Sequence, residues 1–142
     1  MRLTIELVPR TAWYSNVRSN VSRAEWDRIR RKCYESAKHR CEVCNGVGRK
    51  HPVECHEIWE YDDKTYTQTL KGLIALCPDC HKVKHPGLAQ MKGEMNLVER
   101  QLMQVNGITN LEAKAAVNEA FVEWARLSQY EWKLDISYLD NY

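Results

Sequence analysis

Two pairs of cysteines with the same short spacing constrain the fold of this chain most. Cys41 and Cys44 lie in the glycine-bearing stretch "CEVCNGVG", and Cys77 and Cys80 lie in "CPDC" after an apolar run. Two C-x-x-C hooks supply four thiolates, the donor set with which Zn²⁺ forms closed tetrahedral sites. Redox-active pairs are the alternative, but no βαβ pattern surrounds either hook. We therefore predict one structural Zn²⁺ ion, which clamps the first hook to the start of a helix after the second.

The composition predicts a single domain over residues 1–142. A chain of 142 residues, 44% of them hydrophobic, is long enough to bury a core. No segment reaches the roughly 20 apolar residues that a membrane span requires. The first ten residues also lack the continuous apolar run of a secretory signal. We expect a cytoplasmic protein with no membrane partner, in which C-x-x-C spacing favours zinc over disulfides.

Charge is distributed unevenly along the chain. Residues 1–93 carry 17 Lys and Arg against 11 Asp and Glu, whereas residues 94–142 carry 4 against 8. The basic part also contains every cysteine and every histidine. Clustered Lys and Arg attract phosphates whatever the base sequence, so this coincidence indicates a polyanionic ligand near the metal-binding part. A solvated surface is the simpler explanation for any single one of these charges.

The chain before the first hook has the patterns of one strand and one helix. Apolar and polar residues alternate over residues 2–8, which predicts a half-buried strand. Ser22 and Glu25 have the spacing of a capping box at the start of the helical stretch "VSRAEWDRIRRKCYESAKHR". One face of this helix is apolar and includes Cys33, which we expect to pack in the core. The opposite face presents basic residues, among them Arg30 and Arg31, to phosphates.

The chain after the second hook predicts two helices. Apolar residues from Leu88 to Val105 recur every three or four positions, which predicts one amphipathic helix that ends at "NG" and is weakened by Gly93. Thr109 and Glu112 have the spacing of a second capping box, at the start of a last long helix. An apolar stripe along that helix is typical of core packing.

Three histidines between and after the hooks predict a second metal site. Residues 51–76 have the pattern of two strands joined across "YDDK", with His56 on the first strand. His81 and His85 are four residues apart on the helix predicted after the second hook, so their side chains point the same way. With four cysteines committed to zinc, these imidazoles are free to hold another ion beside a base.

The stretches "CEVC", "ECHEIW" and "GLIALCPDCHKVKH" together resemble the HNH endonuclease family, the zinc-clamped branch of the ββα-metal nucleases. The resemblance covers residues 41–86 and is strongest to small HNH proteins of bacteria and their phages. It implies an α+β fold with a ββα-metal, treble-clef-like core, preceded by a strand and helix over residues 1–40 and followed by a helical extension over residues 87–142. The implied activity is metal-dependent cleavage of DNA, in a bacterial or phage-infected cell.

The resemblance also implies roles for individual residues. His56 matches the histidine that activates water in the family, and His81 matches the histidine that binds the catalytic divalent ion. His85 is similar to a second metal histidine, one helical turn later, in some members. The expected ion is a divalent metal such as Mg²⁺, Mn²⁺, Ni²⁺ or Zn²⁺. Independently of the resemblance, the charges of Lys82 and Lys84 suit flanking phosphates, and a solvated helix surface is the alternative for both.

Two positions depart from the family pattern. Gly72 stands where the family has its middle Asn, which is similar to a loop-orienting residue. Cys55 stands where a metal-binding Asp, Asn or His commonly precedes the first histidine. A thiolate there would bias the ion toward Zn²⁺ or a later transition metal. Alternatively, Cys55 packs and a carboxylate of Glu54 or Glu57 serves instead, so the third protein ligand stays open.

Two other classes of function fit parts of the sequence. A non-catalytic zinc-ribbon module that binds nucleic acid would use the hooks and the basic residues. A protein-interaction domain would use the acidic C-terminal helices as its partner surface. Neither class has a use for His56, His81 and His85 together, and this triplet favours the nuclease. The pattern does not predict an oligomeric state.

Overall fold

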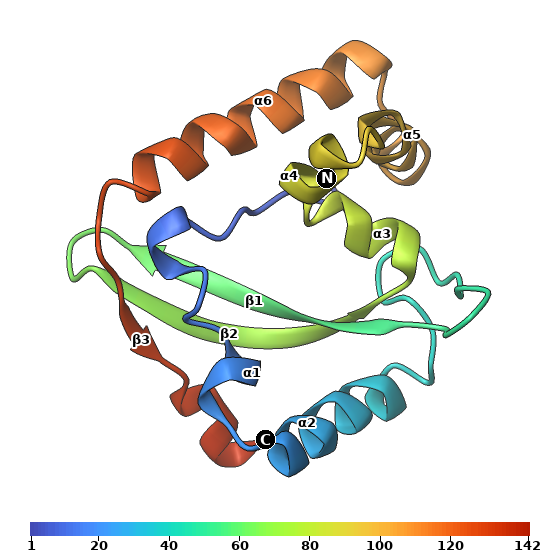
Figure 1. Ribbon diagram of the computed structural model, residues 1–142. Helices are drawn as coiled ribbons and strands as arrows, with labels where there is room; N and C mark the ends of the chain where they lie inside the picture. Colours follow the sequence, from blue (N-terminus) through green and yellow to red (C-terminus); the bar gives the residue numbers. More distant parts are fainter.

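A small sheet separates two groups of helices (Figure 1), in a computed structural model that describes all residues, 1–142. Strands β1 (Glu54–Asp62) and β2 (Thr67–Leu76) form an antiparallel hairpin, and β3 (Lys133–Asp135) pairs parallel with the start of β2. Helix α2 (Arg23–Ser36), preceded by the short α1 (Val17–Asn20), lies on one side of the sheet. The other side carries α3 (Pro78–Val83), α4 (Pro86–Met91), α5 (Met95–Asn106) and α6 (Asn110–Leu127). The predicted α+β class is confirmed.

The hairpin between the two cysteine hooks forms as predicted. Residues 63–66 make the turn between β1 and β2, and the register runs from Glu54 opposite Leu76 to Asp62 opposite Thr67. Gly72 pairs with Ile58 next to the one irregularity in this register. The position of the family's Asn therefore lies within β2 and not in the turn.

The predicted strand over residues 2–8 is wrong, because this segment has no regular structure. The alternation of burial is nevertheless present, with Leu3 fully buried and Ile5 and Leu7 half-buried. The Asn106 side chain of α5 accepts a hydrogen bond from the Leu3 N–H at 2.8 Å and donates one to its carbonyl at 2.8 Å. A side-chain amide thus satisfies the backbone groups that a neighbouring strand would otherwise bind.

Helix α2 begins where the sequence predicts and ends earlier. The Ser22 hydroxyl accepts a hydrogen bond from the Glu25 N–H at 3.1 Å, whereas the Glu25 carboxylate binds Arg28 and does not complete the capping box. Cys33 is buried against the core, as predicted. The helix ends at Ser36 because the residues that follow leave the helical conformation. Lys38 and His39 both have a positive φ.

One predicted helix over residues 88–105 is in fact two. Gly93 has a φ of +69° and breaks the chain into α4 and α5, since a left-handed residue cannot continue an α-helix. Gly107, also left-handed, ends α5 as a C-cap. The capping box of Thr109 and Glu112 is confirmed in full at the start of α6.

The end of the chain returns to the sheet, which the sequence did not predict. After α6 the chain passes Trp132, whose ring contacts that of Tyr61 with centroids 5.2 Å apart, and enters β3. The 3-10 helix η2 (Ser137–Asn141) follows. It packs on the smaller of two apolar clusters, which is formed by Val17, Ile29 and Leu70. The helical extension thus ends at Leu127. A second 3-10 helix, η1, spans Arg10–Ala12 near the start of the chain. None of the helices is both long and apolar enough to cross a membrane.

Candidate metal centres

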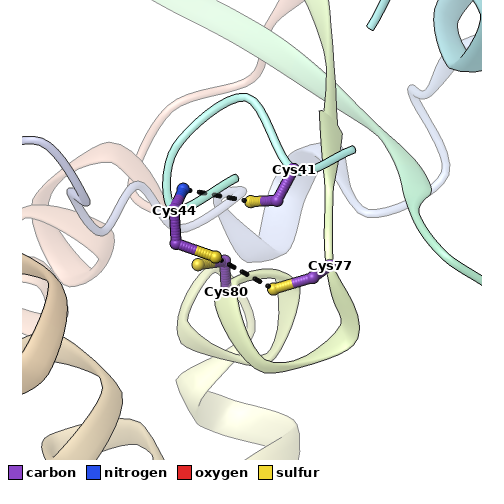
Figure 2. A group of neighbouring side chains, drawn as sticks. All are labelled: Cys41, Cys44, Cys77 and Cys80. Atoms are coloured by element: carbon purple, nitrogen blue, oxygen red, sulfur yellow. Dashed lines mark hydrogen bonds between the residues drawn. The ribbon is translucent and has the colours of Figure 1, made fainter. Parts of the chain in front are cut away.

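The four hook cysteines converge at one end of the hairpin. Figure 2 shows their side chains pointing toward one another, two from the turn after α2 and two from the start of α3. Their sulfur atoms all lie within 4.8 Å of one another, and the sulfurs of Cys44 and Cys77 are 3.6 Å apart. Tetrahedral zinc with bonds of about 2.3 Å separates its sulfurs by roughly 3.8 Å. The cluster could therefore hold a metal ion such as zinc.

Local backbone structure fixes the first hook. The Cys41 N–H donates to the Gly46 carbonyl at 3.0 Å, and Asn45 adopts a positive φ of 65° inside this tight turn. Two backbone N–H groups point at sulfur, from Cys44 to Cys41 and from Gly46 to Cys44, each at 3.4 Å. A Cβ at Gly46 would lie 3.3 Å from the Cys44 sulfur, so glycine gives this N–H its close approach.

Helix α5 contributes a residue to the cysteine cluster that the sequence did not identify. Gln101 donates from Nε2 to the Cys80 sulfur at 3.3 Å, and Cys80 is fully buried. A hydrogen bond from Cys80 lowers the pKa of the Cys41 thiol to about 4, while burial raises the pKa of the Cys77 thiol to about 11. Polar residues are common on helices, so nothing in the pattern singles out Gln101.

The three predicted histidines also come together, from β1, α3 and the residue that caps α4. Nitrogen atoms of His56, His81 and His85 all lie within 4.8 Å of one another, and the Nε2 atoms of His81 and His85 are 3.1 Å apart. The two do not share a helix, because α3 ends at Val83 and His85 is the N-cap of α4. The ring of His56, on β1, lies 5.2 Å and 5.6 Å from the other two rings. Three neutral imidazoles in this arrangement could hold a divalent ion.

Glu54 lies behind His81 and does not join the three imidazoles. One of its carboxylate oxygens accepts a hydrogen bond from His81 Nδ1, and the other is 3.2 Å from His51 Nε2. A proton on Nδ1 leaves Nε2 of His81, the atom that faces His85, with a free lone pair. This is the carboxylate–histidine arrangement that orients metal ligands in proteins.

The other two candidates for the third ligand face α1 and α2. The Cys55 side chain packs against the larger apolar cluster of the core, which includes Cys33, Ala75 and Leu76. The Glu57 carboxylate accepts a hydrogen bond from the Val17 N–H at 2.7 Å, and burial raises its pKa. Neither belongs to the group of nitrogen atoms. Cys55 thus has apolar neighbours and stands outside the histidine group.

His56 is held in its neutral form. Burial is the largest cause, and the neighbouring His81 and His85 add to it, so that the pKa of His56 falls to about 3. At neutral pH its imidazole therefore carries a free lone pair, which a base and a metal ligand both require.

Basic side chains gather on one side of the histidines. A cavity of about 500 Å³ is lined by Arg18, Arg23 and Arg30, together with Tyr34, and reaches His81 and Glu54. We call this cavity the arginine pocket. Arg30 pairs with Asp27 at 2.9 Å. The sequence singled out Arg23 and Arg30 on this wall, but Arg18, which lies in α1, carried no signal.

The other basic residues predicted to contact phosphates differ in their surroundings. Arg31 is exposed and lies outside the arginine pocket. Lys82 is half-buried and pairs with Glu94 at 2.9 Å. Lys84 is only 8% exposed, and its Nζ donates to the Thr4 carbonyl at 2.7 Å and to Glu6 at 2.8 Å. Its ammonium group is thus committed to the N-terminal segment.

Comparisons with known proteins add no relative. No family model, no curated protein and no solved structure matches this chain. The assignment of function therefore depends on the residues of the site alone.

We expect Glu54 to strengthen metal binding at the histidines. Replacing Glu54 with alanine should weaken the affinity for a divalent ion by about 10- to 100-fold, because the orientation and tautomer of His81 are lost. Replacing it with glutamine, whose amide oxygen can still accept from Nδ1, should weaken it less. Calorimetric titration of zinc-loaded protein with Ni²⁺ measures both. Glu60→Ala, an exposed position on the same strand, is the control, and an unchanged affinity in Glu54→Ala would contradict the role.

Proposed function

We propose that the protein is a metal-dependent nuclease of the HNH type that hydrolyses phosphodiester bonds of DNA. The observation that carries this proposal is the convergence of His56, His81 and His85 beside the arginine pocket. A general base, ligands for a divalent ion and cations for phosphate are the parts that such a hydrolysis needs. A module that only binds nucleic acid needs the cations alone.

In this proposal the histidines divide the chemistry between them. His81 and His85 hold a divalent ion, and Glu54 keeps His81 in the required tautomer. The ion would supply positive charge to the phosphate oxygens as negative charge develops on them. His56, neutral at physiological pH, takes the proton from the attacking water. Arg18 and Arg23, which form no ion pair in this structure, bind the phosphates on either side.

The four cysteines support the histidine site without being part of it. We propose that they hold a structural Zn²⁺, which joins the turn after α2 to the start of α3. Cys80 directly precedes His81 in the sequence, so a fixed Cys80 also fixes the start of the segment that carries the histidines. The hairpin positions His56 opposite this segment, and zinc would hold the two parts in register.

Chelation should separate the two metals in a plasmid-nicking assay. We expect nicking with at least one of Mg²⁺, Mn²⁺, Ni²⁺ or Zn²⁺, and mild chelation should remove activity before it removes structure, because two histidines bind an ion more weakly than four cysteines. Added divalent ion should restore activity. Circular dichroism and bound zinc are followed in parallel.

Variants of His81 and His85 test in the same assay whether these residues hold the second ion. His81→Ala and His85→Ala should both bind the second ion more weakly and keep one zinc per chain, with the larger loss of affinity in His81→Ala. Normal cleavage by both variants would contradict the proposed nuclease. DNA binding without cleavage under any metal would favour the zinc-ribbon module.

A further inference from the structure

The histidine site borders a second cavity of opposite character. This cavity, of about 650 Å³, is the apolar groove; it starts at the three histidines and shares Arg18 and His81 with the arginine pocket. Its apolar walls come from three parts of the chain. The N-terminal segment contributes Trp13, α4 contributes Leu88 and Met91, and α6 contributes Phe121 and Trp124. The reaction proposed above accounts for the arginines and the histidines but gives these apolar walls no role.

The apolar groove is open to solvent although it is lined by large side chains. Trp13 is 60% exposed and Met91 is 86% exposed. On α6 the apolar stripe begins at the buried Ala113 and Val117 and continues to Phe121 and Trp124, which line the groove only half-buried. Exposed apolar surface next to a site of charged and metal-binding groups is typical of a surface that binds a ligand.

A single nucleotide unit has the same two-sided character as these neighbouring cavities. Its phosphate is anionic and suits Arg18 and Arg23, whereas its base has an apolar face that stacks on aromatic side chains. In a duplex the faces of the bases are already stacked on one another and their pairing edges are occupied. The grooves present the remaining polar edges. An apolar hollow beside the metal site would therefore gain little from duplex DNA and much from an unpaired base.

We infer that the site takes an unpaired nucleic-acid strand, with one base in the apolar groove against Trp13 and its phosphates in the arginine pocket. For cleavage this inference rests on the proposed function. For binding it does not, because the groove and the arginines are present whether or not the histidines perform chemistry.

Binding is measured by fluorescence anisotropy with zinc-loaded protein and no second metal, so that no cleavage intervenes. We expect a labelled single-stranded DNA to bind at least about tenfold more tightly than the same sequence as a duplex. An abasic strand, which keeps the phosphates and lacks the bases, should bind about as weakly as the duplex. Equal affinity for all three would overturn the inference.

Trp13 offers a test in the protein with a matched neighbour. Trp13→Ala should weaken single-strand binding by about 5- to 100-fold, the usual range for loss of one stacking partner, while Trp13→Phe retains most of it. Tyr14, 86% exposed and outside the groove, is the control, since Tyr14→Ala should bind as the unchanged protein does. Unchanged binding by Trp13→Ala overturns the inference, as does Trp13-dependent self-association in sedimentation, which would make a second copy the occupant.

Cleavage assays distinguish failure of this inference from failure of the proposed function. Faster cleavage of the single strand than of the duplex supports both. Cleavage of both forms at equal rates keeps the nuclease and overturns the preference for an unpaired strand. Trp13-dependent binding of the single strand without cleavage under any metal keeps the base-binding groove and contradicts the nuclease.

Discussion

Cys80→Ser should unfold the centre of the protein and abolish the zinc binding proposed for the four cysteines. Cys80 is fully buried, its sulfur lies within 4.8 Å of three others, and it accepts a hydrogen bond from Gln101. Serine is a poor zinc ligand, and structural zinc supplies folding free energy directly, with apparent values of about 10–16 kcal/mol in zinc-finger peptides. The net stability of a domain is about 5–15 kcal/mol, so a domain that loses most of the free energy of zinc binding cannot stay folded.

Metal analysis and thermal unfolding followed by circular dichroism measure this effect. The purified protein should contain one zinc per chain, and Cys80→Ser should contain none and show no cooperative transition. Cys33→Ala is the matched control, because Cys33 is also a buried cysteine but lies outside the cluster. It should keep its zinc and lose only the small stability of one truncated side chain. Native stability of Cys80→Ser would contradict the four-cysteine site.

His56→Ala should slow cleavage by about 10²- to 10⁴-fold, the usual cost of losing a general base. Zinc content, folding and DNA affinity should stay nearly unchanged, because a base acts in the transition state and contributes little to ground-state binding. The pKa of His56 in the protein is about 3, below the value near 6.5 of a free histidine. Lowering the pH from 8 to about 5 should therefore not reduce the rate through protonation of this residue.

Single-turnover cleavage of a labelled DNA at several pH values measures both effects. His39→Asn is the control: His39 is exposed, lies away from the site, and has a positive φ that asparagine tolerates. Calorimetry on His56→Ala, with the ion that supports cleavage, separates two roles. Retention of the second ion supports a base, whereas its loss would make His56 a third ligand and contradict the proposed role.

Features set by residues close in sequence were predictable. The cysteine spacing placed both hooks in the cluster, and the apolar alternation placed His56 on a strand facing the later histidines. Thr109 and Glu112 marked the start of α6 because a capping box needs only four consecutive residues. In each case the pattern that made the prediction lies within a few consecutive residues.

Features set by distant partners were not predictable. Residues 2–8 have the alternation of a strand, but Asn106 of α5 binds their backbone in place of a neighbouring strand. Lys84 looked like a surface lysine and is buried because Glu6 and Thr4 surround its ammonium group. Glu54 was a candidate ligand, but in the structure its carboxylate accepts a hydrogen bond from His81 on α3, which the sequence did not predict. Such pairings depend on how separate elements pack.

The parallel pairing of β3 with β2 affects the order in which a newly synthesised chain can fold. Every cysteine of the cluster has been made once α3 is complete, so this end of the hairpin can close early. The partner of Thr67–Thr69 is made only after α3 to α6, since β3 follows all four helices. During that interval the edge of β2 has unpaired backbone groups, the kind of edge on which partly made chains associate. We therefore expect chains interrupted before β3 to aggregate more readily than complete ones.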